Sequence, residues 1–152
     1  MTIAEVLKES GYKTAFMGKW GIGLCGTEGV PEKQGFDLSF GYYDQGRAHT
    51  FYPNYLIKNG DTVWLEDNFG YDMAKMYKMN GLEDPPAELL NDYNADGEIQ
   101  PWGIDASRAQ YSEALFQEEA LNFIQDNAEN PFFLYYATQL PHGPVTVDTL
   151  GD

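Results

Sequence analysis

A continuous apolar and aromatic run near the end of the chain constrains the fold most. The segment Pro131-Phe132-Phe133-Leu134-Tyr135-Tyr136-Ala137 contains no charged side chain. Such a run is typical of a parallel β-strand that is covered on both faces. Residues 117–127, whose apolar side chains recur at helical spacing, precede it, and Asn130-Pro131 ends this helix. A helix followed by a buried strand predicts an α/β fold.

The first twenty residues predict the same order of elements. Thr2 and Glu5 have the spacing of a capping box, which indicates the start of a helix. Gly11 occupies the position that commonly ends a helix. Residues 12–17 then predict a short strand, and Gly18 permits a sharp turn just before Lys19.

A cationic or titratable side chain follows each of these two predicted strands. Lys19 lies in Gly18-Lys19-Trp20-Gly21, and His142 lies in Pro141-His142-Gly143-Pro144. Ligands of open α/β sheets bind beyond the carboxyl ends of the strands. We therefore expect Lys19 and His142 to converge on one anion, with the fixed φ angles of the prolines limiting where the imidazole points.

Composition bounds the class of protein. A length of 152 residues with 43% hydrophobic content predicts one domain, residues 1–152. No apolar run approaches the roughly 20 residues that cross a bilayer, so no membrane span is expected. The single Cys25 excludes an internal disulfide, and no export signal is visible, so the compartment stays open.

The net charge of -15 decides what the chain is expected to bind. Such an excess of acidic groups repels nucleic acid phosphates, which argues against nucleic-acid binding. An anionic ligand must therefore be bound by a local cluster of positive groups. The candidates are Lys19, Arg47, His49 and His142.

Two stretches between the predicted strands are expected to be irregular. Residues 21–44 are rich in glycine and predict a loop that aromatic side chains hold in place. Residues 44–59 mix polar and aromatic side chains, including Arg47, His49 and Tyr52, which suits either a cleft lining or an aromatic-anchored surface loop. Residues 62–103 predict short helices and loops.

Within the last stretch, Asp92, Asn94 and Asp96 begin a pattern that matches the first eight positions of an EF-hand calcium loop. The twelfth position, where a bidentate Glu closes such a loop, is Gly103. Two interpretations remain open here, a calcium site and a polar turn.

The motifs add up to a family resemblance. They are, in chain order, Thr2-Ile3-Ala4-Glu5-Val6-Leu7-Lys8, Gly11-Tyr12-Lys13-Thr14-Ala15, Gly18-Lys19-Trp20-Gly21, Gln34-Gly35-Phe36-Asp37, Ala48-His49, Tyr52-Pro53, Pro131-Phe132-Phe133-Leu134 and Pro141-His142-Gly143-Pro144. This order resembles the arylsulfatase-type sulfatases of the alkaline phosphatase superfamily. The resemblance covers nearly the whole chain apart from residues 61–103.

The resemblance implies a partial α/β sandwich with mainly parallel central strands, and hydrolysis of sulfate esters. In such enzymes the residue matching Lys19 contacts the sulfate oxygens and the catalytic aldehyde hydrate, and the residue matching His142 binds sulfate near the leaving-group oxygen. His49 resembles part of a substrate-facing loop, and Arg47 is a candidate clamp for sulfate. The implied ligand is a sulfated small molecule or a sulfated carbohydrate.

The chain also departs from the family pattern. Gly21 stands where many members have His, and no Cys or Ser is followed by x-Pro-x-Arg, the segment that yields formylglycine. Cys25 is followed by Gly26-Thr27-Glu28, so it is not that nucleophile. The paired Asp residues that hold calcium in the family are missing too.

These departures predict an internal fragment of a sulfatase catalytic domain. The calcium ligands and the formylglycine are then expected in the full-length parent, which the family suggests is periplasmic or secreted. The fragment itself is expected to be inactive and prone to aggregation, because its buried-type strand lacks neighbours.

Two other functions remain open from the residues. A phosphoesterase of the same superfamily is one, because phosphate and sulfate esters share tetrahedral geometry. The other is a noncatalytic carbohydrate-binding module, in which exposed aromatic side chains stack on sugars. The candidates for such stacking are Tyr42, Tyr43, Tyr52, Tyr55 and Trp64.

Overall fold

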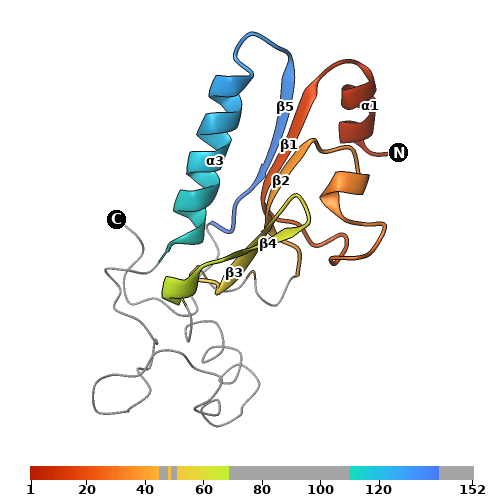
Figure 1. Ribbon diagram of the computed structural model, residues 1–152. Coiled ribbons are helices and arrows are strands. Elements are labelled where there is room, and N and C mark those ends of the chain that lie inside the picture. The colour runs from red at the N-terminus through yellow and green to blue at the C-terminus, as the bar shows by residue number, and fades with distance from the viewer. Residues whose placement is uncertain (45–47, 49–50, 69–109, 141–152) are drawn as a thin grey trace, which may run out of the picture.

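A mixed β-sheet between helices forms the core of the protein (Figure 1). The structure is a computed structural model that describes residues 1–44, 48, 51–68 and 110–140. Helix α3 (Ser112–Asp126) lies against one face of the sheet, and α1 (Ile3–Glu9) lies on the other. Short 3-10 helices, η1 (Pro31–Lys33) and η3 (Glu66–Asn68), complete the described elements.

The sheet has five strands in the order β4-β3-β2-β1-β5. The central strand β1 (Lys13–Lys19) pairs in parallel with both β2 (Leu38–Tyr42) and β5 (Phe132–Ala137). Strands β3 (Tyr55–Lys58) and β4 (Asp61–Trp64) continue the sheet in antiparallel pairs. The expected partial α/β architecture with parallel central strands is confirmed.

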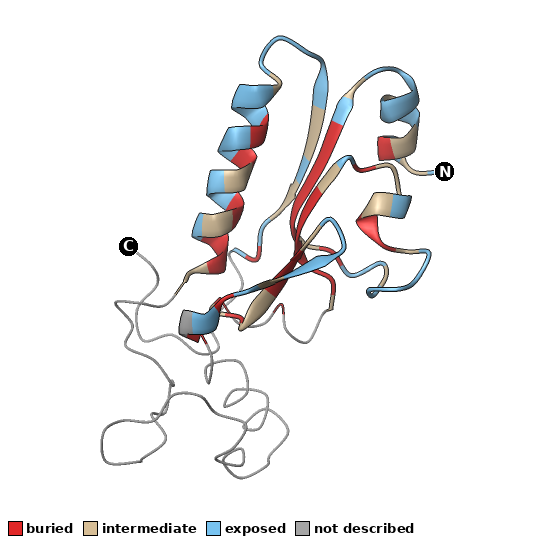
Figure 2. Ribbon diagram, in the orientation of Figure 1, coloured by how far each residue is buried: buried red, intermediate tan, exposed pale blue. Residues whose placement is uncertain are grey.

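Two hydrophobic clusters hold the layers together, one on each face of β1. Met17 packs with Phe116 and Phe123 of α3, whereas Phe16 packs with Ala4 of α1 and with Phe36. Neighbouring residues of a strand point to opposite faces, so β1 supplies both clusters. Figure 2 shows the resulting buried band along β1 and along the side of α3 that faces the sheet.

Helix α1 agrees with its sequence signals. The Thr2 hydroxyl accepts a hydrogen bond from the Glu5 amide at 3.2 Å, and the Glu5 carboxylate accepts one from the Thr2 amide. This is the predicted capping box. Gly11 follows the last turn with φ of 88°, a conformation that favours glycine.

Strand β5 is present as predicted, but the prediction that both its faces are covered is wrong. Phe132 is 36% exposed and Tyr135 is 47% exposed. The reason is the position of β5 at the edge of the sheet, where β1 alone pairs with it among the described residues. The strand that is buried on both faces is β1.

The predicted loop over residues 21–44 is wrong at its end, where β2 forms. Phe40 and Tyr42 of β2 pack in edge-to-face geometry against Phe116 of α3, at ring centroid distances of 5.4 and 5.8 Å. This tertiary packing outweighs the low strand propensity of the neighbouring glycines.

Gly18 and Gly41 are partners across β1 and β2 and allow the strands to approach closely. A Cβ atom on Gly18 would lie 2.2 Å from the Ala137 carbonyl oxygen, and one on Gly41 would lie 2.0 Å from the Gly18 carbonyl oxygen. The predicted sharp turn at Gly18 is therefore wrong. The strand continues through Lys19, and glycine is needed because a side chain would collide with backbone.

Strands β3 and β4 form a hairpin that the sequence interpretation missed. Asn59 and Gly60 connect them, with φ of 51° and 86°. Asn-Gly with two positive φ angles is the pattern of a type I′ turn, whose twist matches that of paired strands. The expectation of only helices and loops from residue 62 onward is wrong for β4, and the Asn59-Gly60 pair was the signal that could have corrected it.

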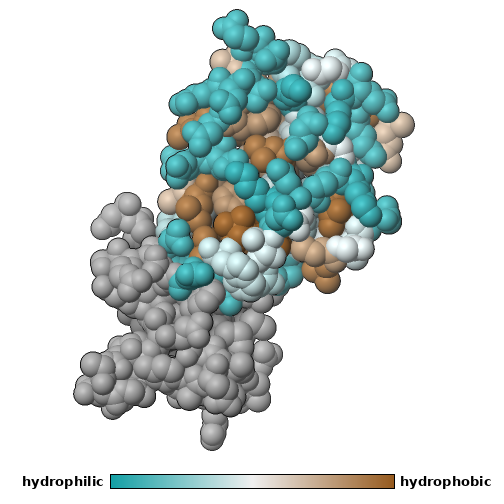
Figure 3. Space-filling view, viewed as in Figure 1, coloured by the Kyte–Doolittle hydropathy of each residue, from teal (hydrophilic) through white to brown (hydrophobic). Residues whose placement is uncertain are grey.

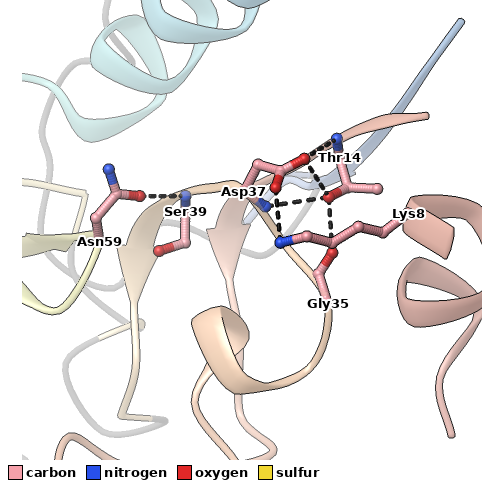
Figure 4. Close-up of polar contacts among 6 residues, drawn as sticks. All are labelled: Lys8, Thr14, Gly35, Asp37, Ser39 and Asn59. Carbon is pink, nitrogen blue, oxygen red and sulfur yellow. Dashed lines mark hydrogen bonds and ion pairs between the residues drawn. The ribbon is translucent and has the colours of Figure 1, made fainter. Parts of the chain in front are cut away.

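A polar network joins α1, β1 and the segment before β2 (Figure 4). Asp37 accepts hydrogen bonds from the Thr14 amide and hydroxyl, both at 3.1 Å, and forms an ion pair with Lys8 at 2.7 Å. The Thr14 hydroxyl also lies 2.7 Å from the Gly35 carbonyl oxygen. The network holds the Gly35-Phe36-Asp37 motif against the start of β1.

None of the described helices is both long and apolar enough to cross a bilayer.

Candidate functional site

The carboxyl ends of the three parallel strands share one edge of the sheet. Lys19 is the last residue of β1, and it lies beside Tyr42, the last residue of β2. Gly18 lies beside Ala137, the last residue of β5. The chain that follows each strand therefore leaves from this carboxyl edge, which is where an α/β sheet binds ligands.

Lys19 differs from three of the four other lysines in the described part of the chain. Lys8, Lys33 and Lys58 each lie within 2.7 to 2.8 Å of a carboxylate oxygen. Lys19 is partly buried, and no described residue forms an ion pair with it. Lys19 thus places a positive charge at the carboxyl edge without a counter-ion among the described residues.

The other three predicted site residues, Arg47, His49 and His142, lie outside the described residues. However, two described residues that lie close to them in the sequence, Ala48 and Gln139, contact each other. The side-chain amide of Gln139 donates a hydrogen bond of 2.6 Å to the Ala48 carbonyl oxygen. Ala48 separates Arg47 from His49 in the sequence, and Gln139 precedes His142 by three residues.

Gln139 and Glu113 belong to a buried polar cluster that the sequence interpretation missed. The Gln139 amide N–H donates to Glu113 Oε1 at 2.6 Å, and the Ser112 hydroxyl donates to Gln139 Oε1 at 2.9 Å. Tyr136 donates to Glu113 Oε2 at 3.2 Å. The adjacent polar residues Ser112 and Glu113 at the start of an apolar helix were the only signal in the sequence.

The carboxylate of Glu113 also affects its aromatic neighbour. Burial and the negative charge of Glu113 raise the pKa of the Tyr136 hydroxyl well above its ordinary value. Tyr136 therefore stays protonated across the physiological range and remains a hydrogen-bond donor to Glu113.

A cavity of about 360 Å³ opens at the same carboxyl edge. Tyr42, Tyr43 and Asp44 line it from the end of β2, Tyr55 lines it from the start of β3, and Cys25 lines it from the loop after β1. The cavity is large enough for part of a small ligand.

Cys25 does not have the properties of a nucleophile. Burial raises the pKa of its thiol, and the negative charge of Glu32 raises it further. The reactive form of cysteine is the thiolate, which a raised pKa disfavours. This agrees with the exclusion of Cys25 from the sequence pattern.

The loop after β1 is held to β2 by a hydrogen-bonded group. Ser39 donates to Glu32 at 2.6 Å, Tyr43 donates to the same carboxylate, and the Ser39 and Tyr43 hydroxyls share a bond of 2.7 Å. Burial, and then the bond to Glu32, raise the pKa of Tyr43 strongly. Tyr42 and Tyr43 are only 2% and 3% exposed, so neither ring is free to stack on a sugar.

Residues 1–44, 48, 51–68 and 110–140 contain no cluster of three His, Cys, Asp or Glu side chains able to hold a metal. The calcium-loop pattern at Asp92, Asn94 and Asp96 lies outside these residues.

The fold is that of an α/β protein whose three parallel strands end at one edge of the sheet. The Sulfatase family model matches residues 1–149. The chain belongs to the sulfatase family.

Curated relatives agree with this assignment. The chain is 27% identical to an N-acetylgalactosamine-6-O-sulfatase of Bacteroides thetaiotaomicron, with 95% of the chain and 32% of the relative covered. It is 29% identical to human Arylsulfatase A and 30% identical to mouse Arylsulfatase G, covering 95% and 96% of the chain. The chain spans 25% and 26% of the lengths of these last two relatives.

Solved structures show the same fold. The chain superposes with a TM-score of 0.52 and 28% identity on Ps i-CgsB, solved in complex with k-i-k-neocarrahexaose, covering 95% of this chain and 27% of that one. A Bacteroides thetaiotaomicron sulfatase of glycosaminoglycan metabolism superposes with a TM-score of 0.53, 24% identity and coverage of 94% and 34%, and it supports the fold alone. The predicted family and fold class are confirmed.

Proposed function

We propose that this chain supplies the sulfate-binding edge of a sulfatase active site, as part of a partial catalytic domain. One observation carries the proposal. Lys19 lies partly buried at the carboxyl end of the central parallel strand, without an ion pair among the described residues. A chain with a net charge of -15 needs such a local cation to bind a sulfate ester.

The chemistry follows from where charge develops during hydrolysis. An oxygen that derives from water becomes bonded to sulfur as the bond between sulfur and the ester oxygen breaks, and negative charge builds up on the sulfate oxygens and on the leaving oxygen. The Lys19 ammonium stabilises charge on the sulfate oxygens, because a fixed cation needs little rearrangement in the transition state. His142 donates a proton to the leaving oxygen, since an imidazole pKa lies near neutrality.

Arg47 and His49 are proposed to bind the substrate together with His142. The support is the contact between Ala48 and Gln139, which joins the two segments. Sulfated carbohydrate is the favoured substrate class, because one relative is an N-acetylgalactosamine-6-O-sulfatase and another was solved with k-i-k-neocarrahexaose.

Calcium and formylglycine, which the family resemblance implies, do not fit the described residues. No acidic or histidine cluster there can hold a metal, and the pKa of the Cys25 thiol is raised. We propose that residues outside this chain supply both groups, and we assign no step through them to this chain.

The test uses the longest uninterrupted reading frame that contains this chain. Sulfate release is measured from sulfated N-acetylgalactosamine and from 4-nitrophenyl sulfate, with 4-nitrophenyl phosphate as the substrate of the alternative phosphoesterase. Lys19→Met is expected to lower kcat/KM for sulfate esters by about 100-fold or more. Lys13→Met, at the exposed beginning of the same strand, is the matched control and is expected to leave the rate unchanged.

Two results would contradict the proposal. Faster hydrolysis of the phosphate ester would favour the phosphoesterase. Equal losses in Lys19→Met and Lys13→Met would show that Lys19 has no specific role in binding sulfate.

A further inference from the structure

The hairpin of β3 and β4 brings two aromatic side chains to the carboxyl edge of the sheet. Strand β3 runs antiparallel to β2, so Tyr55 at the start of β3 lies on the side of the sheet where β2 ends. Trp64, the last residue of β4, is the register partner of Tyr55. Lys19 ends β1 at the same edge. A row of strand ends therefore leads from Lys19 to Trp64.

Trp64 is 57% exposed, although its indole is a large apolar side chain. Its ring meets the Tyr55 ring edge to face, at a centroid distance of 5.3 Å and an interplanar angle of 68°. Trp20, by contrast, is 9% exposed, and its indole N–H donates to the Gly29 carbonyl oxygen at 2.7 Å. Trp20 thus stabilises the core, whereas the contact with Tyr55 orients the Trp64 ring and leaves much of it at the surface.

The cavity of about 360 Å³ at the carboxyl edge begins beside this aromatic pair, because Tyr55 lines it. Tyr43 and Ile57 add apolar wall, and Asp44 supplies carboxylate oxygens. No lysine or arginine is among the described residues that line the cavity. Such a lining suits an uncharged sugar ring, whose C–H groups pack on aromatic faces and whose hydroxyls donate to oxygen atoms. A sulfate group would gain no cation from these walls.

The distance along the edge decides how long a ligand must be. Strands β4, β3, β2 and β1 are neighbours in that order, so three strand spacings separate Trp64 from Lys19. At about 4.8 Å for each spacing, the two backbones lie about 14 Å apart. A ligand that reaches from Lys19 to Trp64 must therefore contain more than one sugar ring.

We propose that the cavity beside Tyr55 and the exposed ring of Trp64 bind unsulfated sugar rings of an oligosaccharide whose sulfated ring lies at Lys19. The substrate class is then a sulfated oligosaccharide or polysaccharide, and a sulfated monosaccharide or a small aryl sulfate fills only part of the site. The position of the sulfated ring rests on the proposed function. Binding of the unsulfated rings requires neither sulfate nor turnover, so it is tested separately.

The first test measures the binding of two unsulfated hexasaccharides, agarohexaose and chondroitin hexasaccharide, to the full-length protein by saturation-transfer NMR and calorimetry. At least one of them is expected to bind. Trp64→Leu keeps an apolar side chain but removes the flat ring, and it is expected to raise Kd about tenfold. Trp64→Phe, which retains an aromatic face, is expected to keep most of the affinity.

Leu121→Ala is the matched control, because it truncates an apolar side chain that is 50% exposed on α3. It is expected to leave Kd unchanged. If thermal unfolding shows that Trp64→Leu does not fold, Cys25→Phe replaces it, since this change fills the cavity from an exposed position of the loop after β1. Failure of the unaltered protein to bind either hexasaccharide, or equal losses in the test and control variants, would overturn the inference.

The second test compares the hydrolysis of sulfated N-acetylgalactosamine with that of a chondroitin 6-sulfate hexasaccharide and of k-i-k-neocarrahexaose. Contacts far from the reacting bond stabilise the ground state and the transition state equally, so their loss raises KM and leaves kcat in place. Trp64→Leu is expected to raise KM about tenfold more for a hexasaccharide than for the monosaccharide. An equal rise for both, or a lower kcat for every substrate, would overturn the inference. Absence of sulfatase activity in the unaltered protein would instead refute the proposed function and leave the first test intact.

Discussion

Single side chains at the two ends of β1 have opposite roles. At the beginning of the strand, Thr14 and Asp37 are joined by hydrogen bonds, and Lys8 completes an ion pair. At the end of the strand, Lys19 has no such pair among the described residues. The first end therefore stabilises the fold, and the second keeps a charge for the proposed ligand.

Asp37 predicts an acid dependence of stability. Burial acts to raise the pKa of Asp37, but hydrogen bonds from Lys8 and Thr14 outweigh it, so the net pKa is lowered. A lowered pKa means that the stabilisation is present above the unfolded pKa of about 3.9 and is lost as pH falls through the folded value. We expect Asp37→Asn to lower the free energy of unfolding at pH 7 and to flatten its decline below about pH 4.

Urea denaturation of the longest folded polypeptide that contains this chain, measured from pH 2.5 to 7, checks this prediction. Asp61→Asn, at an exposed position that begins β4, is the control and should retain the acid dependence. If the free energy of unfolding varied with pH in parallel for Asp37→Asn and the unaltered protein, Asp37 would not contribute to the acid dependence.

At the scale of elements, the close approach of β5, β1 and β2 depends on the partners Gly18 and Gly41. A side chain in place of either glycine would collide with backbone atoms, which cannot rotate away. The polar cluster of Gln139 and Glu113 then joins α3 to the end of β5. The two glycines thus set the spacing of the strands through their small size. Gln139 and Glu113 set the position of α3 through hydrogen bonds.

Gly41→Ala is expected to separate β1 from β2 and to destabilise the fold by about 3 kcal/mol, at the upper end of overpacking effects. Gly11→Ala provides the comparison, because nothing lies within 4 Å of its Cβ position and only the positive φ opposes it. That change should cost about 1 kcal/mol. Thermal unfolding of both variants measures the difference, and a smaller loss for Gly41→Ala than for Gly11→Ala would contradict the packing argument.

At the scale of the whole molecule, apolar surface is exposed at the open edge of the sheet. An apolar groove of about 270 Å³ lies between α1 and β5, and Ile3, Phe133 and Tyr135 are among its lining residues. Hydrophobic residues also reach the surface between hydrophilic ones in Figure 3. Open strand edges and apolar faces of this kind promote association between chains.

We expect the isolated chain to self-associate, and more strongly in salt, because salt screens the repulsion from a net charge of -15. Tyr135→Lys, on the exposed edge strand, is expected to reduce the association measured by light scattering. Leu121→Lys, at a position of α3 that is 50% exposed, is the control and should reduce it less. A monomeric chain with a cooperative thermal transition would show that the open edge is tolerated.

Local signals in the sequence were sufficient for several elements. The capping box and Gly11 predicted α1, and the run that contains Phe132–Ala137 predicted β5. Strand β2 was missed because its neighbouring glycines resemble a loop, and its strand conformation depends on packing against Phe116. The hairpin was missed although Asn59-Gly60 is a local signal.

The pattern of residues along the chain was enough to predict the family, the order of the helix–strand units and the place of Lys19 at the end of a parallel strand. These properties depend on residues that are close together in the chain. The three-dimensional arrangement was needed to show that β1 is the buried strand, that β5 is an edge, and that Gln139 contacts Ala48 and the start of α3. The hydrogen bond from Gln139 to Ala48 joins residues 91 positions apart, and β1 pairs with β5 from near the other end of the chain. No local pattern specifies such pairs.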